Sequence, residues 1–107
     1  MIQLKEKFSR MGEEFTQIYK DDRVVVYYTT FPSVEVFEYR VGAPFEFQPN
    51  PDEFERYPRS EDFGVWAWCA TTTEQVKRIL ETHFADHSQI HDIYRELQAI
   101  LREKSFR

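Results

Sequence analysis

The sequence is short of cysteine, glycine and long apolar runs, and each shortage excludes a class of protein. With one cysteine, Cys69, the chain cannot form an internal disulfide. The three glycines, at positions 12, 42 and 64, are too far apart to form a phosphate-binding loop or a dinucleotide fingerprint. The longest apolar run, at 63–70, is far shorter than the roughly twenty residues that cross a bilayer. We therefore expect no membrane span.

The chain also lacks an excess of basic residues. Residues 1–23 carry five basic and five acidic side chains, residues 24–73 carry three and eight, and residues 74–107 carry six and six. The whole net charge of −5 therefore arises in the middle of the chain. Nucleic-acid-binding proteins concentrate Lys and Arg, because contacts with phosphates supply their affinity. We expect no direct binding of nucleic acid.

What the chain does contain is typical of one small globular domain. Its 107 residues, 1–107, match a common domain size, and charged residues make up an ordinary 31%. Aromatic residues reach 17%, including ten Phe and six Tyr, so we expect a core rich in rings. Charged residues appear too early at the N-terminus for the apolar part of a signal peptide, which predicts a cytoplasmic protein.

The first third of the chain predicts a short helix followed by a β-hairpin. Leu4, Phe8 and Met11 have helical spacing. Residues 14–19 and 23–30 then flank a pair of aspartates, whose carboxylates can accept hydrogen bonds from backbone amides in a tight turn.

Two more predicted strands complete a four-stranded sheet. The β-branched and aromatic run at 24–28 does not alternate with polar residues, which indicates a central strand covered on both faces. The strand predicted at 34–41 changes its apolar face after Val36, so we expect a bulge or a change of cover there. The fourth strand is predicted at 63–70.

Between these two strands, residues 42–62 show no period and contain four of the five prolines. We expect an irregular acidic loop of about twenty residues, a length that is usually functional or packed down by its own side chains. Four aromatic residues could do that packing: Phe45, Phe47, Phe54 and Tyr57.

The C-terminal third predicts helix, because residues 73–104 contain no Gly or Pro and carry apolar residues at helical spacing. Two capping boxes fit its start: Thr71 with Glu74, and Thr72 with Gln75. One long helix is an alternative. We favour two, because Asp86 or Ser88 could cap a second helix and globular helices average about a dozen residues.

The sequence therefore predicts an α+β domain. Its sheet is four-stranded and mostly antiparallel, and one long or two shorter C-terminal helices pack on one face. The small side chains of Val65, Ala67 and Cys69 should share one face of their strand and form the bed for a helix.

Two features suggest partner binding. Trp66 and Trp68 are two residues apart, so they should face the same side of their strand as an aromatic platform, unless loop aromatics cover them. The acidic loop at 46–62 could present carboxylates to a basic partner, unless it is merely solvated. The predicted partner-binding residues are Trp66, Trp68, Tyr57, Glu55, Glu61 and Asp62.

The three histidines, His83, His87 and His91, are each four residues apart. On a continuous helix they would share one face, where neighbouring imidazoles could bind zinc. The alternative is a row of partly buried imidazoles at a packing interface, which would make helix packing or dimerisation depend on pH near 6.5. Zinc is the only cofactor that the sequence suggests, and this site is its only candidate.

No catalytic residue is predicted. Cys69 with His83 could form a thiol and imidazole pair, but a cysteine among small apolar neighbours in a strand is usually a small core residue. Adjacent acids such as Glu61 and Asp62 are usually solvated. We favour a non-enzymatic protein over an enzyme.

One segment carries a resemblance. Residues 55–58 read Glu-Arg-Tyr-Pro, and after four residues Phe63-Gly64-Val65-Trp66-Ala67-Trp68 leads to a Thr-capped helix. This segment resembles parts of small uncharacterised bacterial and bacteriophage proteins that have a strand meander and a C-terminal helix. The resemblance implies no activity or catalytic residue, but it implies an accessory protein of a mobile genetic element.

The sequence as a whole predicts a small, non-enzymatic protein-interaction module whose partner is a protein, with a homodimer as one form of that partnership. Two alternatives remain open. One is an acidic inhibitor that imitates nucleic acid towards a DNA- or RNA-binding protein, and the other is a metal-binding protein or enzyme that uses the histidine row.

Overall fold

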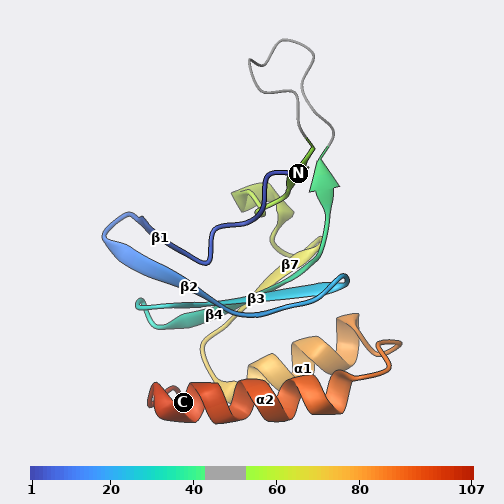
Figure 1. Cartoon of the computed structure of the whole chain (residues 1–107). Coiled ribbons are helices and arrows are strands. Elements are labelled where there is room, and N and C mark those ends of the chain that lie inside the picture. The colour runs from blue at the N-terminus through green and yellow to red at the C-terminus, as the bar shows by residue number, and fades with distance from the viewer. Residues whose placement is uncertain (43–52) are drawn as a thin grey trace.

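The structure is a computed structural model that describes residues 1–42 and 53–107. A five-stranded antiparallel sheet lies between two unlike layers, with two helices on one face and irregular segments on the other (Figure 1). The strands follow the order β1 (Lys7–Arg10), β2 (Glu13–Lys20), β3 (Val24–Thr29), β4 (Ser33–Glu38) and β7 (Ala67–Ala70). The predicted α+β class is confirmed, and the sheet has one strand more than predicted.

The additional strand is β1, in a segment for which the sequence predicts a short helix, and that prediction is wrong. Met11 and Gly12 both have positive φ angles, of 53° and 82°, and form a two-residue turn that pairs β1 with β2. Turns of this kind match the twist of a hairpin. Leu4 and Phe8 pack against an aromatic cluster instead of lining a helix, so tertiary contacts override their helical spacing.

The predicted hairpin of β2 and β3 is confirmed, and Asp21 forms its turn. One carboxylate oxygen, Oδ1, accepts hydrogen bonds from the backbone N–H groups of Arg23 (2.7 Å) and Val24 (2.8 Å). Four consecutive residues of β3, Val24 to Tyr27, are fully buried, as expected for a central strand covered on both faces.

The bulge or change of cover predicted after Val36 is wrong, because β4 keeps regular pairing through Phe37 and both of its faces are covered, and the strand ends at Glu38. The chain then enters a small two-stranded sheet, β5 (Val41–Gly42) with β6 (Phe54–Glu55), and Ile2 pairs with β6 on its other side. A Cβ atom at Gly42 would lie 2.4 Å from the Phe54 ring, so glycine is needed there. The 3₁₀ helix η1 (Ser60–Asp62) follows before β7.

Two helices close the chain, as favoured from the sequence: α1 (Thr73–His83) and α2 (Ile90–Glu103). Thr72 caps α1 by accepting a hydrogen bond from the Gln75 backbone N–H at 3.1 Å. The predicted capping box of Thr72 with Gln75 is only half formed, because the Gln75 side chain accepts the Thr71 backbone N–H instead. The helix α2 begins after Gln89, without a side-chain cap, so neither Asp86 nor Ser88 has the predicted role. Neither helix has the length and apolar character needed to cross a membrane.

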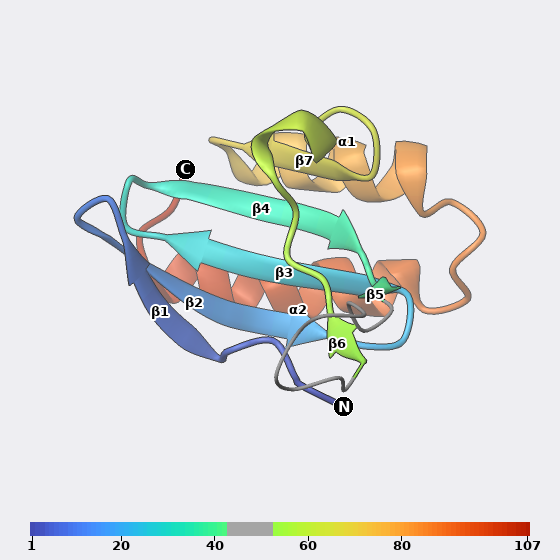
Figure 2. The ribbon, with the colours of Figure 1, turned by 90° about the horizontal axis from the view of Figure 1, so that it is seen from above.

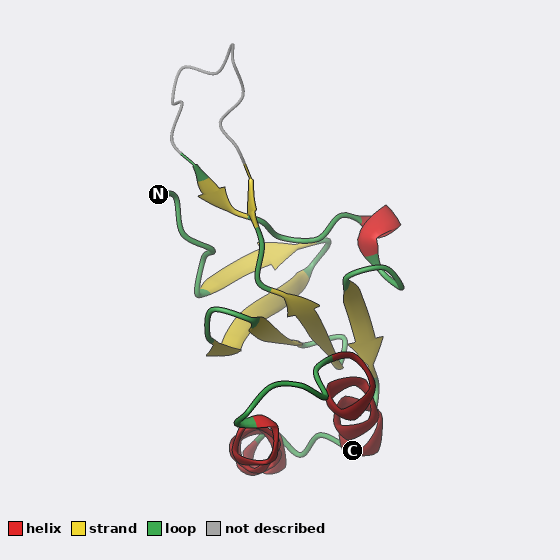
Figure 3. Ribbon diagram, turned by 90° about the vertical axis from the view of Figure 1, so that its right-hand side faces the viewer, coloured by secondary structure: helices red, strands yellow, loops and turns green. Residues whose placement is uncertain are grey.

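The helices cover one face of the sheet, and that face is not the predicted one (Figure 3). Their apolar stripes pack on Val24, Val26, Val34, Val36 and Ala70. Ala67 instead joins a second core on the opposite face, Cys69 is exposed, and Val65 is 69% exposed in the turn before the strand. The bed of the helices is therefore made by β3, β4 and Ala70, whereas Ala67 and Cys69 share the opposite face.

Leu97 on α2 is fully buried in the core between the helices and the sheet, so its substitution tests the packing of that core. Leu97→Ala should lower the free energy of unfolding by about 3 kcal/mol through lost burial and the cavity that remains. Chemical denaturation of the two proteins measures this difference. The exposed neighbour Arg95 provides the control, since Arg95→Ala should change stability by less than about 0.5 kcal/mol. Equal effects of the two substitutions would contradict the assigned packing.

Candidate functional site

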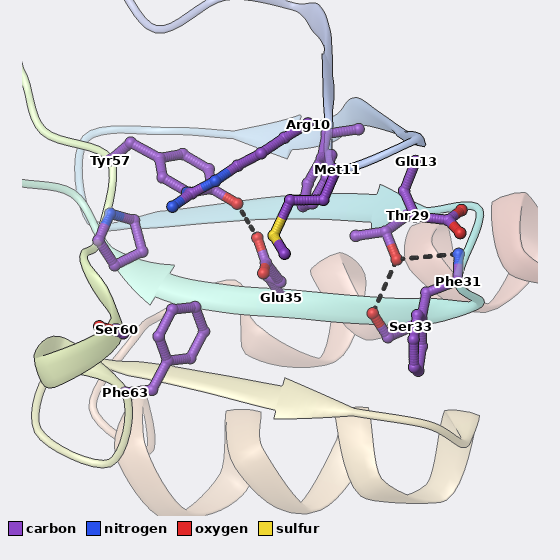
Figure 4. A pocket seen from close by; sticks show the side chains of 12 residues that line it. Arg10, Met11, Glu13, Thr29, Phe31, Ser33, Glu35, Tyr57, Ser60 and Phe63 are labelled. Atoms are coloured by element: carbon purple, nitrogen blue, oxygen red, sulfur yellow. Dashed lines mark hydrogen bonds between the residues drawn. The ribbon is translucent and has the colours of Figure 1, made fainter.

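A pocket of about 560 Å³ lies on the helix-free face of the sheet (Figure 4). Strands β2, β3 and β4 provide its floor, the β1–β2 turn provides one side, and the segment 57–63 provides the other. Figure 2 shows how this segment passes across the sheet on the side away from the helices. Ligand pockets commonly have this size and a mostly apolar lining with a few polar groups.

The segment 57–63 is held in place by packing and by Asp62. The ring of Tyr57 makes edge-to-face contacts with Phe8, Tyr27 and Phe37, at centroid distances of 5.3, 5.5 and 5.5 Å. The Asp62 carboxylate accepts the Arg59 backbone N–H at 2.8 Å, and this bond fixes the 3₁₀ turn. The side of the pocket is therefore built into the aromatic core.

Glu55 anchors the same segment at its start. Its carboxylate is 5% exposed, binds the Lys20 ammonium at 2.5 Å and accepts the Leu4 backbone N–H at 2.8 Å. A hydrogen bond from Tyr39 also stabilises the Glu55 carboxylate. Burial opposes the charge of Glu55, but the hydrogen bond from Lys20 and then that from the Leu4 amide lower the pKa of Glu55 below its usual value. This one carboxylate joins the N-terminal segment, β2 and β6.

Three hydrogen-bonded hydroxyl groups and the carboxyl group of Glu35 are among the polar groups of the pocket, which also include Arg10, Glu13 and Ser60. Tyr57 donates a hydrogen bond from its hydroxyl to Glu35 on β4. At the hairpin end of β3 and β4, the hydroxyl groups of Thr29 and Ser33 bond each other at 2.8 Å. These hydroxyls are paired within the protein, whereas a carboxylate oxygen has room for more than one donor.

Burial raises the pKa of Glu35, and the hydrogen bond from Tyr57 and the charge of Arg10 offset only part of that rise. Burial and the same hydrogen bond raise the pKa of Tyr57, so its hydroxyl remains a donor at neutral pH. None of the ion pairs among the described residues involves Glu35 or Arg10. The pocket therefore contains a partly buried carboxylate without a cation in contact.

Two exposed apolar side chains flank the pocket. Met11, in the β1–β2 turn, is 93% exposed, and Phe31, in the β3–β4 turn, is 73% exposed. Both line the pocket, so the apolar surface extends from inside it onto the two turns. Contiguous exposed apolar surface of this kind marks interaction sites more often than scattered single residues do.

The two tryptophans do not form the predicted platform, because they lie on opposite faces. Trp66 is 2% exposed in the aromatic core, and the guanidinium groups of Arg40 and Arg56 lie 4.8 and 5.3 Å from its ring centre. Trp68 lies on the helical face and stacks on His83 at 3.8 Å. The reason is the turn at 64–66, since only Trp68 belongs to the strand.

The other predicted contact residues are placed differently from one another. Tyr57 lines the pocket, Glu55 is a buried structural anchor, and Asp62 fixes the 3₁₀ turn. Glu61 is exposed beside the pocket but does not line it. The predicted covering residues Phe45 and Phe47, and the loop from Glu46 to residue 52, lie outside the described residues.

The histidines are not brought together, because α1 ends at His83 and α2 begins at Ile90. His87 lies between the helices, where its Nε2 is 2.8 Å from the Asp21 carboxylate. His83 stacks on Trp68, and His91 lies on α2. Over residues 1–42 and 53–107, no three side chains of His, Cys, Asp or Glu are grouped as metal ligands.

Cys69 does not meet His83 either. It faces the helix-free side opposite Glu35 in the β4–β7 register, whereas His83 lies on the helical side. Desolvation by the surrounding protein raises the pKa of the Cys69 thiol above its usual value. A raised pKa does not activate a thiol as a nucleophile.

Sequence reasoning identified Tyr57 but missed the rest of the pocket, including Glu35, Phe31 and Arg10. One local signal was available, because Glu35 is the only charged residue in the run from Val34 to Phe37. A charge within an apolar strand often has a specific role. Comparisons with protein-family models, with curated proteins and with solved structures found no match.

Because Glu55 is a buried anchor, loss of its ion pair with Lys20 should destabilise the protein more than loss of an exposed ion pair. Lys20→Met leaves the Glu55 carboxylate buried without its cation, so the free energy of unfolding should fall by about 2–3 kcal/mol. The matched control is Lys7→Met, because Lys7 and Glu14 form an exposed pair at 3.0 Å and such pairs contribute about 1 kcal/mol or less. Urea denaturation compares both. Lys20→Met combined with Glu55→Gln should recover part of the loss, and equal effects of the two lysine substitutions would contradict the anchor.

The raised pKa of Glu35 predicts a pH-dependent gain from Glu35→Gln, which keeps an acceptor for Tyr57. A carboxyl whose pKa is raised on folding favours its protonated form in the folded state, so it loses stability as pH rises through that pKa. Glu35→Gln should therefore be more stable than the natural protein at about pH 7 and equally stable at about pH 3. Thermal unfolding at both values measures this, and a gain that is larger at acidic pH would reverse the assigned direction.

Proposed function

We propose that this protein is a non-enzymatic protein-interaction module that binds its partner through the pocket on the helix-free face of the sheet. The observation that carries the proposal is the pocket of about 560 Å³, whose lining combines aromatic rings with a few fixed polar groups. A concave, mostly apolar site with convergent polar groups is the first candidate for binding in a structure of this kind.

The surroundings of the pocket favour a protein over a free small molecule. Met11 and Phe31 line the edge of the pocket and are largely exposed, so a small molecule inside the pocket covers only the parts of these two side chains that face it. A protein surface that inserts one side chain into the pocket can also cover these two residues. Anchor side chains seated in a pocket and surrounded by apolar contacts are the usual centre of a protein interface.

The site is also supported by its rigid construction. The Glu55 anchor and the packing of Tyr57 hold one side, and the paired strands hold the floor, so binding needs little ordering of the protein. The segment from Glu55 to Trp68 resembles parts of small bacterial and bacteriophage proteins. This resemblance predicts that the protein is an accessory protein of a mobile genetic element and that its partner belongs to the host.

A random peptide library displayed on phage tests the proposal without knowledge of the partner. Peptides enriched on the natural protein are titrated against Ser60→Trp, which places an indole in the pocket, and against Glu61→Trp. Ser60 and Glu61 are exposed neighbours, but only Ser60 lines the pocket, so the second variant is the matched control. We expect Ser60→Trp to weaken binding about tenfold or more and Glu61→Trp to leave it nearly unchanged.

The proposal is overturned if no peptide is enriched, or if enriched peptides bind both variants equally well. Sedimentation of the free protein over a range of concentrations adds a second result. A dimer that Ser60→Trp dissociates and Glu61→Trp preserves would show that a second copy of this chain occupies the pocket, and would overturn a different protein as the partner.

A further inference from the structure

We infer that the partner's side chain in this pocket is a lysine, whose ammonium group binds the carboxylate of Glu35 while its apolar stem lies against the aromatic lining. This inference rests on the proposed function, since it names the group that enters the same pocket. It follows from the charge of the pocket, the hydrogen bonds already made inside it and the rings around it.

Among the polar groups of the pocket, the carboxylate of Glu35 leaves a position for an incoming cation beside the aromatic rings. The hydroxyl groups of Thr29 and Ser33 bond each other, and the Tyr57 hydroxyl donates to Glu35. A carboxylate accepts several hydrogen bonds, and Glu35 takes part in no ion pair with the described residues. An ammonium group brings three donors and the opposite charge to this carboxylate.

The charges that line the pocket favour a cation over an anion. Two carboxylates, Glu35 and Glu13, line it together with one guanidinium group, Arg10. Glu13 already accepts a hydrogen bond from the Thr30 hydroxyl at 2.5 Å and lies towards the hairpin turns, so Glu35 is the carboxylate nearer the aromatic side. Arg10 is exposed on the edge strand, where it can move aside without disturbing the core.

The aromatic lining suits the stem of a lysine. Tyr57 and Phe63 lie on one side of Glu35 (Figure 4). Phe15 on β2 also lines the pocket, so a chain of methylene groups can reach the carboxylate along ring surfaces. Lysine combines such an apolar stem with a compact charge at its end. Ring faces near the ammonium add a favourable cation–π contribution.

A series of four peptides tests the inference. The sequence acetyl-Ala-Leu-X-Leu-Ala-amide is synthesised with lysine, acetyl-lysine, norleucine or glutamate at X, and amide chemical shifts of the labelled protein measure each affinity. We expect the lysine peptide to bind about tenfold more tightly than the acetyl-lysine peptide, because acetylation removes the charge and keeps the stem. The glutamate peptide should bind most weakly.

Two variants locate the charge that is responsible. Glu35→Gln keeps an acceptor for Tyr57 and should abolish the preference for lysine over acetyl-lysine. Glu13→Gln removes the other carboxylate of the pocket and should retain most of that preference. Equal binding of lysine and acetyl-lysine to the natural protein, or a lysine preference that survives in Glu35→Gln, would overturn the inference.

The series also separates this inference from the proposed function. If the norleucine peptide shifts the resonances of pocket residues as strongly as the lysine peptide does, the pocket binds apolar side chains and only the lysine assignment fails. If no peptide of the series shifts those resonances, both the lysine assignment and the proposed function fail.

Discussion

The contact between Glu55 and Lys20 is the interaction on which the rest of the helix-free face depends. The segment that leads to β7 must cross that face, and the buried carboxylate of Glu55 fixes where the crossing begins. Because the same carboxylate also binds the Leu4 amide, the N-terminal segment closes over the aromatic core from one end. A buried ion pair contributes little net stability compared with apolar residues, but it specifies one arrangement of the groups that meet at it.

The two faces of the sheet are covered by different means, and this difference creates the pocket. On one face, two amphipathic helices fill the space over β3 and β4 with continuous apolar stripes. On the other, rings from short segments pack around Tyr27 and Phe37 and cover only part of the sheet. The uncovered part lies towards the β1–β2 and β3–β4 turns, where Met11 and Phe31 are exposed. An incomplete second layer thus leaves a concave surface on a rigid floor.

Local signals in the sequence were sufficient for much of the fold. The hairpin at Asp21, the buried run of β3 and the cap at Thr72 each depend on residues close together in sequence, and each was predicted. The strand β1 was not, because the spacing of Leu4 and Phe8 fits a helix and only their contacts with the aromatic core decide against it. The prediction that the two tryptophans share one face of the strand was wrong, because the turn at Gly64 delays the start of β7 until after Trp66.

The candidate site was less predictable than the fold, for a physical reason. Its residues come from two hairpin turns and the strands that they join, and from a segment more than twenty residues further on, so no window of sequence contains it. Glu55 and Tyr57 were predicted as partner contacts, whereas the structure makes Glu55 an anchor and Tyr57 the donor to Glu35. An unusual residue in a loop can be either a structural anchor or a partner contact, and only its contacts in the folded protein distinguish the two roles.

The most direct test of the central claim is to map the binding surface with a small uncharged probe. Amide chemical shifts of the labelled protein, recorded during a titration with benzyl alcohol, report which surface takes up an aromatic group. We expect shifts that saturate and are confined to the residues around the pocket, with those of Glu35, Ser33 and Phe63 among the largest. Shifts spread over α1 and α2, or no saturable shifts near Glu35, would contradict the assignment of the pocket as the binding site.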